Sequence, residues 1–146
     1  MTQKDKKAVL ADLVKLSTEN LESLLNTAVE CYSDGDLARA EQILKGLILL
    51  SPKDARPVAL YASTLLLQEK QLEAEEAYEQ AYALDPNDMY VLATLGELKL
   101  KSLQIEAAAP YLEKLFALDP KGQHPAANRA RQLVLEYYKK LGGQQT

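Results

Sequence analysis

The sequence predicts an all-α fold built from stacked helix–turn–helix repeats, and three observations support this prediction. A tripeptide that ends in proline recurs every 34 residues, at Leu50-Ser51-Pro52, Leu84-Asp85-Pro86 and Leu118-Asp119-Pro120. Twelve residues before each proline lies a small residue, and eight residues before it lies a large apolar one: Ala40, Ala74 and Ala108, then Leu44, Tyr78 and Leu112. Each 34-residue unit also carries two stretches of helical periodicity, which is typical of a stacked helical array.

The repeated residues have a physical reason. A small residue such as Ala74 lets the two helices of a unit approach closely, and Tyr78 one turn later fills the space beside it. Pro86 ends the second helix because proline lacks an N–H group, and Asp85 or Asp88 can cap the helix that follows. This pattern resembles the tetratricopeptide repeat (TPR) family. The resemblance implies a right-handed superhelical solenoid in a single domain, with repeats at 20–53, 54–87 and 88–121.

The turns inside the repeats are predicted from local composition. Gly35 suits the left-handed residue that ends the first helix of repeat one. The turn of repeat two is expected at Gln68–Gln71, and that of repeat three at Leu103, where no glycine is present. Pro110 lies within the second helix of repeat three and predicts a kink or a late start of that helix.

Two helices are expected outside the repeats. The N-terminal helix, 4–16, carries an apolar stripe formed by Val9, Leu10, Leu13 and Leu16, and Ser17-Thr18 is expected to interrupt it. A bare helix of this length is marginal in water, so the stripe should cap the chain's own repeats or support a homodimer. A C-terminal helix at 124–141 should cover the open end of the stack, and the tail at 142–146 is expected to be disordered.

Composition excludes several classes of function. Lys and Arg number 17 against 21 Asp and Glu, and the formal net charge of −4 disfavours a nucleic-acid partner. The single cysteine, Cys31, excludes an intrachain disulfide and fits a reducing compartment. No apolar run approaches the length of about 18 residues that a membrane-spanning helix needs, so membrane insertion is not expected. We expect a cytoplasmic protein.

The sequence offers little for catalysis, and we expect neither an enzyme nor a cofactor or metal site. His124 is the only histidine and lies beside a proline in a loop, where a structural or incidental role is favoured. Cys31 falls where the first helix should pack between helices, so an inert buried thiol is favoured. The acidic run Glu73, Glu75, Glu76 and Glu79 is expected to be a solvated outer face.

The remaining candidate is a peptide-binding groove, because the first helix of every TPR unit lines the concave face. The positions expected there are Leu25, Val29, Tyr32, Ala59, Leu60, Ser63, Leu67, Tyr90, Ala93, Thr94 and Glu97. For Leu60 and Leu67 a core position is an equal alternative. Some TPR domains hold a peptide's carboxylate with Lys and Asn at these places, but Leu25 and Val29 disfavour that mode here. Arg56 is the one cation expected near the groove, held by Asp54 at the start of a helix.

The layout further resembles the TPR chaperones of bacterial type III secretion that hold hydrophobic translocator proteins. The matching residues are Tyr32 with Gly35, Asp54-x-Arg56, Leu84-Asp85 and Glu97, whereas Pro57, Thr94 and Leu103 depart from the pattern. The resemblance implies a virulence-associated chaperone that binds an extended apolar segment of a secreted hydrophobic protein and keeps it soluble before export. Two alternatives stay open: a general TPR scaffold in another assembly, and a chaperone of a secretion needle subunit.

Overall fold

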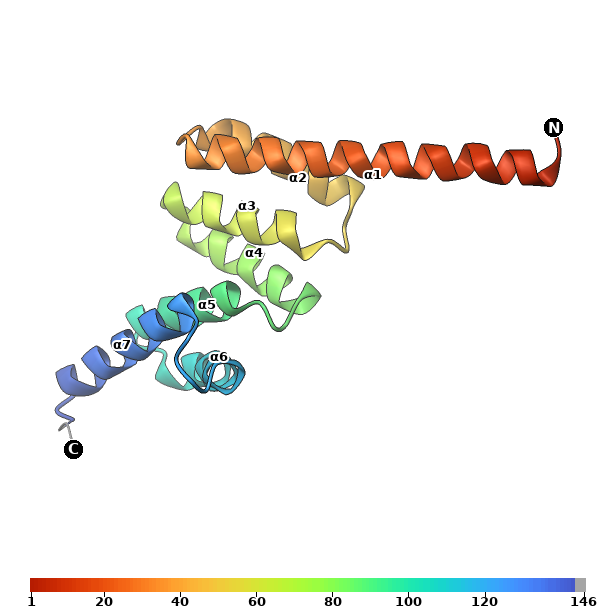
Figure 1. Ribbon diagram of the computed structural model, residues 1–146. Coiled ribbons are helices and arrows are strands. Elements are labelled where there is room, and N and C mark those ends of the chain that lie inside the picture. Colours follow the sequence, from red (N-terminus) through yellow and green to blue (C-terminus); the bar gives the residue numbers. More distant parts are fainter. Residues whose placement is uncertain (144–146) are drawn as a thin grey trace. The chain divides into compact units, whose positions relative to one another are not determined.

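The computed structural model describes residues 1–143 and contains seven α-helices and no strand in that range (Figure 1). The helices are α1 (Gln3–Ser33), α2 (Leu37–Leu50), α3 (Ala55–Leu67), α4 (Gln71–Leu84), α5 (Met89–Lys101), α6 (Ile105–Leu118) and α7 (Pro125–Lys140). The predicted all-α fold is confirmed. The greater part of the expected tail, residues 144–146, lies outside the described residues.

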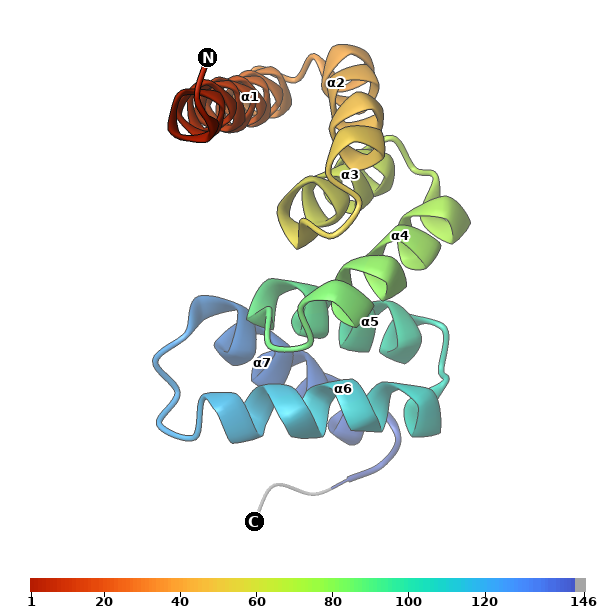
Figure 2. The same cartoon turned by 90° about the vertical axis from the view of Figure 1, so that its right-hand side faces the viewer.

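The chain divides into two compact units. Unit 1, Met1–Lys70, contains α1, α2 and α3, and unit 2, from Gln71 onward, contains α4 to α7. The helices of the second repeat, α3 and α4, therefore belong to different units. Within unit 1, α2 packs against both α1 and α3; within unit 2, α5 packs against α4, α6 and α7 (Figure 2).

The residues that define the repeat are core residues. Ala40, Ala74 and Ala108 are fully buried, and Leu44, Tyr78 and Leu112 are at most 6% exposed. Helices α5 and α6 come especially close: a Cβ atom added to Gly96 would lie 2.5 Å from Cδ2 of Leu112. The 34-residue period therefore reflects close helix packing at every turn of the repeat.

One boundary predicted from the sequence is wrong. The N-terminal helix does not end at residue 16; α1 runs without a break from Gln3 to Ser33. The Thr18 hydroxyl donates to the Val14 carbonyl oxygen at 3.0 Å, so this side chain is satisfied within the helix and does not compete with it. Thr2 and Asp5 form a capping box at the true start.

The three predicted turns are confirmed, and their left-handed residues follow the same period. Gly35, Glu69 and Leu103 have φ angles of +82°, +62° and +58°, and they lie 34 residues apart. Only the first is a glycine, so the other two turns hold a side chain in a conformation that costs about 1 kcal/mol. The predicted late start of α6 is wrong: this helix begins at Ile105 and continues through the exposed Pro110. The alanines before Pro110 favour helix strongly enough to offset one missing N–H group.

Candidate groove residues and the polar networks beside them

The α1 positions predicted for the groove are partly core. Leu25 and Tyr32 are half-buried and pack against the cluster formed by Ala28, Cys31, Ala40, Leu44 and Leu47. Val29 is 44% exposed and presents a free apolar surface. Cys31, 8% exposed, lies in the same cluster, as expected for an inert thiol.

The α3 positions divide in the same way. Leu60 packs against the core cluster of unit 1, whereas Leu67 is 56% exposed at the last residue of α3. Of the two readings left open for these leucines, Leu60 therefore takes the core position and Leu67 a surface position. Ala59 and Ser63 are half-buried.

In unit 2 the α5 positions differ sharply from one another. Tyr90 is 58% exposed, and Thr94 is half-buried. Ala93 is fully buried in a cluster with Ala126, Ala127 and Ala130, so the prediction that it lines a groove is wrong. The reason is that α7 packs closely on α5 through its own small residues.

Glu97 is also engaged by α7. Its carboxylate accepts a hydrogen bond from Nε of Arg129 at 2.6 Å, and its side chain is only 14% exposed. The pair borders a cleft of about 230 Å³ between α5 and α7, lined by Glu97, Lys101, Arg129, Gln132, Leu133 and Glu136. Glu97 is thus an anchor for the C-terminal helix, a role that the sequence pattern did not predict.

His124 has a structural role that links the α6–α7 loop to Tyr90. It is the N-cap of α7, where its Nδ1 accepts a hydrogen bond from the backbone N–H of Ala126 at 3.2 Å. Its own backbone N–H donates to Oδ2 of Asp119 at 3.1 Å. Its ring meets the ring of Tyr90 edge to face, with centroids 4.9 Å apart and planes at 67°.

Asp119 organises the loop that carries His124. Its buried carboxylate also accepts the backbone N–H of Gln123 at 2.9 Å and Nη1 of Arg131 at 3.1 Å. Arg131 donates a further hydrogen bond to the Asp119 carbonyl oxygen and lies 5.0 Å from the centroid of the Phe116 ring. Burial alone would raise the pKa of Asp119, but the hydrogen bonds from Gln123, His124 and Arg131 outweigh it and hold the pKa below its ordinary value.

Arg56 in unit 1 is saturated by carboxylates. Asp54 accepts its Nε at 3.1 Å and its Nη2 at 2.7 Å, which confirms the predicted contact, and also caps α3 by accepting the Arg56 backbone N–H. Glu22 from α1, not predicted, accepts Nη1 at 3.2 Å and Nη2 at 2.6 Å. The side-chain hydrogen bonds from Arg56 lower the pKa of both Asp54 and Glu22. Arg56 therefore has little capacity left for a ligand's carboxylate.

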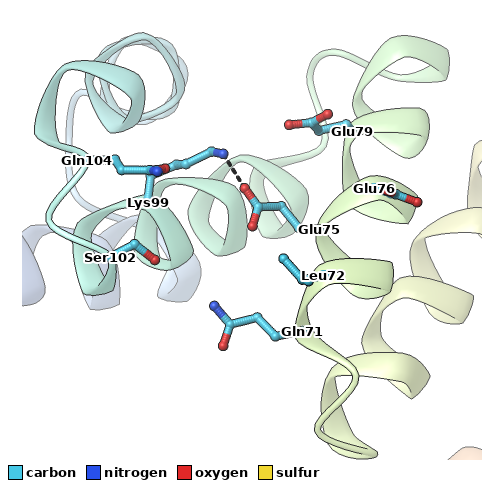
Figure 3. Close-up of a pocket in the computed structure, with 8 residues that line it drawn as sticks. All are labelled: Gln71, Leu72, Glu75, Glu76, Glu79, Lys99, Ser102 and Gln104. Carbon is cyan, nitrogen blue, oxygen red and sulfur yellow. Dashed lines mark ion pairs between the residues drawn. The ribbon is translucent and has the colours of Figure 1, made fainter.

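A second cleft, of about 440 Å³, lies between α4 and α5 (Figure 3). The prediction that all four glutamates of the acidic run are solvated is wrong for Glu75, which is half-buried and forms an ion pair with Lys99. The hydrogen bond to Glu75 raises the pKa of Lys99. Glu73, Glu76 and Glu79 are exposed, as predicted.

Two general features complete the description of the surface. Within residues 1–143, no group of His, Cys, Asp or Glu side chains is arranged to hold a metal ion. Over the same described range, none of the helices combines the length and apolar character that crossing a bilayer requires.

Neither a protein-family model nor a curated protein matches the sequence. Solved structures do match. The translocator chaperone SycD of Yersinia enterocolitica is 18% identical, with a TM-score of 0.78 over 90% of this chain and 92% of that one. PcrH of Pseudomonas aeruginosa, solved with the chaperone-binding region of PopD, is 19% identical, with a TM-score of 0.75 over 85% and 95%. The TPR domain of Arabidopsis OM64 is 18% identical, with a TM-score of 0.70 over 82% and 97%. This likeness establishes that the chain has a TPR-type fold.

Proposed function

We propose that this chain is a secretion chaperone that binds an extended apolar segment of a secreted, translocator-type protein and keeps it soluble before export. The observation that carries the proposal is the fold shared with SycD and PcrH, which were solved with peptides or binding regions of the translocators YopD, PopD and PopB. The proposed role implies action in the cytoplasm, in a virulence-associated secretion system. The solved neighbours named here are chaperones and a TPR domain rather than enzymes.

The chemistry of the groove candidates supports an apolar segment. Val29, Leu67 and Tyr90 lie on the first helices of their repeats and are between 44% and 58% exposed. Tyr90 can offer broad contact area while its hydroxyl remains in water. Because Arg56 is already paired with two carboxylates, an acidic segment or a free carboxyl terminus gains little there.

A general TPR scaffold is the second candidate, and the likeness to the OM64 TPR domain favours it. The two candidates differ in what they bind. A chaperone should select apolar peptides in an extended form and should keep a hydrophobic secreted protein soluble on co-expression. A scaffold should instead select polar or charged motifs and bind folded partners without changing their solubility.

The first prediction concerns peptide affinity. The probe is a fluorescein-labelled peptide selected from a random-sequence display library against the wild-type chain. Because Tyr32 packs in the core, we pair Leu67→Ser with Tyr90→Ala, both at exposed positions. Truncating buried binding anchors typically costs about 2 kcal/mol or more, so affinity should fall at least roughly tenfold by fluorescence polarisation.

The matched control keeps the residue types but leaves the groove. Leu72→Ser with Tyr138→Ala also changes an exposed leucine and an exposed tyrosine, which are 80% and 52% exposed, and should leave affinity unchanged. Equal losses in the two double variants, or no loss in the first, would contradict the proposal.

The proposed chaperone also forms a homodimer through α1. Residues 1–20 are all exposed, and Val9, Leu10, Leu13 and Leu16 are 48% to 62% exposed (Figure 1). Eighteen residues make five helical turns, so Leu10 and Leu13 stand in line with the buried Ala28 and Cys31. The face that packs on the rest of unit 1 thus continues uncovered, and a second copy is the occupant that an "alternative dimer" of SycD favours.

The second prediction tests this dimer by light scattering on a size-exclusion column. Leu10→Glu with Leu13→Glu places charge within the stripe and should convert a dimer to a monomer. Ala8→Glu with Ala11→Glu adds the same charge about half a turn away and should leave the dimer intact. A wild-type chain of monomeric mass would rule the dimer out.

A further inference from the structure

Tyr90 is the most exposed aromatic residue among the predicted groove positions. Its backbone is fixed, because Asp88 caps α5 and accepts the Tyr90 N–H at 2.9 Å. The ring itself stands at the first turn of the helix, where an exposed side chain ordinarily samples several rotamers. The ring of His124 is the one aromatic contact that the structure gives Tyr90.

His124 is held firmly enough to act as a fixed support. Its backbone N–H is bound by Asp119 at 3.1 Å, and its Nδ1 is bound by the Ala126 N–H at 3.2 Å. Asp119 is fixed in turn by Arg131 from α7. The Asn128 side chain adds a hydrogen bond to the Gly122 carbonyl oxygen at 2.7 Å, which closes the same loop. The imidazole ring is therefore fixed by its own helix cap and loop.

We propose that His124 is a positioning residue for client binding: it holds the ring of Tyr90 in the orientation that receives an apolar side chain of the client. This inference rests on the proposed function and assigns a role to a residue outside the repeat pattern. A ring ordered before binding saves the cost of ordering it in the complex, and for one such side chain this is worth roughly three- to tenfold in affinity.

The test separates the ring of His124 from its capping role. His124→Asn removes the ring but keeps a side chain that caps helices well. We expect affinity for the selected fluorescein-labelled peptide to fall about three- to tenfold, with helicity unchanged and the thermal midpoint within about 2 °C of wild type. Asp36→Asn at the N-cap of α2 is the matched control, because it changes a cap that has no aromatic contact, and it should leave affinity unchanged.

A double-mutant cycle identifies Tyr90 as the residue through which His124 acts. In a Tyr90→Ala background, His124→Asn should cause no further loss of affinity. In the free protein, NMR should show a change in the Tyr90 ring-proton shifts on His124→Asn, because the ring current of the imidazole is removed. A purely structural role would not produce this dependence on Tyr90.

The outcomes are separable. If Leu67→Ser with Tyr90→Ala leaves peptide affinity unchanged, the proposed function fails and this inference fails with it. If that variant weakens binding while His124→Asn does not, only the positioning role is overturned. A loss from His124→Asn that persists in full in the Tyr90→Ala background also overturns it.

Discussion

Two arginine–aspartate networks use the same charges in different surroundings. In unit 1, Arg56 binds Asp54 and Glu22 with side chains that are 58%, 28% and 49% exposed. In unit 2, Arg131 binds Asp119, whose side chain is only 8% exposed. The first network lies in water and its main effect is to occupy a cation beside the groove candidates. The second is buried and supports the loop beneath His124 and Tyr90, so burial rather than charge separates their roles.

The largest effect is expected from breaking the buried network. Arg131→Met removes a charged partner and leaves the Asp119 carboxylate in a buried position with only backbone donors. Breaking a buried ion pair is strongly destabilising, so the thermal midpoint followed by circular dichroism should fall by on the order of 10 °C. An unchanged midpoint would show that the backbone N–H groups alone hold the loop.

The same substitution at the exposed network is the control. Arg56→Met should lower the thermal midpoint by less than about 2 °C, because exposed ion pairs contribute little in high dielectric. A loss as large as that of Arg131→Met would mean that the difference in burial between the two networks does not decide their contribution.

A smaller effect is expected from pH. The pKa of Asp119 is lowered in the folded chain, so its ionised form stabilises the fold above the unfolded value of about 3.9, and this stability is lost as the pH falls toward the lower folded value. Asp119→Asn should therefore be less stable than wild type near pH 7, and the gap between the two should narrow below about pH 4. Thermal midpoints measured from pH 3 to pH 7 test this, and a constant gap would contradict it.

The sequence predicted the features that repeat. Ala40, Ala74 and Ala108 are buried as expected, because a fixed period puts the same packing requirement on the same position of each unit. The three turns were predicted for the same reason, including that at Leu103, which lacks glycine. Periodic features can be read from one chain because each copy supports the interpretation of the others.

The features that the sequence missed do not repeat. Ser17-Thr18 suggested a break, but Thr18 binds within α1, and only the structure shows which bond a hydroxyl makes. Ala93 and Glu97 were placed in the groove from the repeat register, yet α7, which belongs to no repeat, covers the first and pairs with the second. His124 looked incidental because its contacts, Asp119 excepted, depend on how α7 and α5 meet.

The most direct test of the central claim is to map where a client segment binds. Amide and methyl NMR shifts of the wild-type chain are recorded with and without the selected apolar peptide, here unlabelled. We predict that the largest changes occur at Val29, Leu67, Tyr90 and Thr94, on the first helices of the three repeats. Changes confined to the outer face of α4, at Leu72 and Glu76, would contradict the proposed mode of binding.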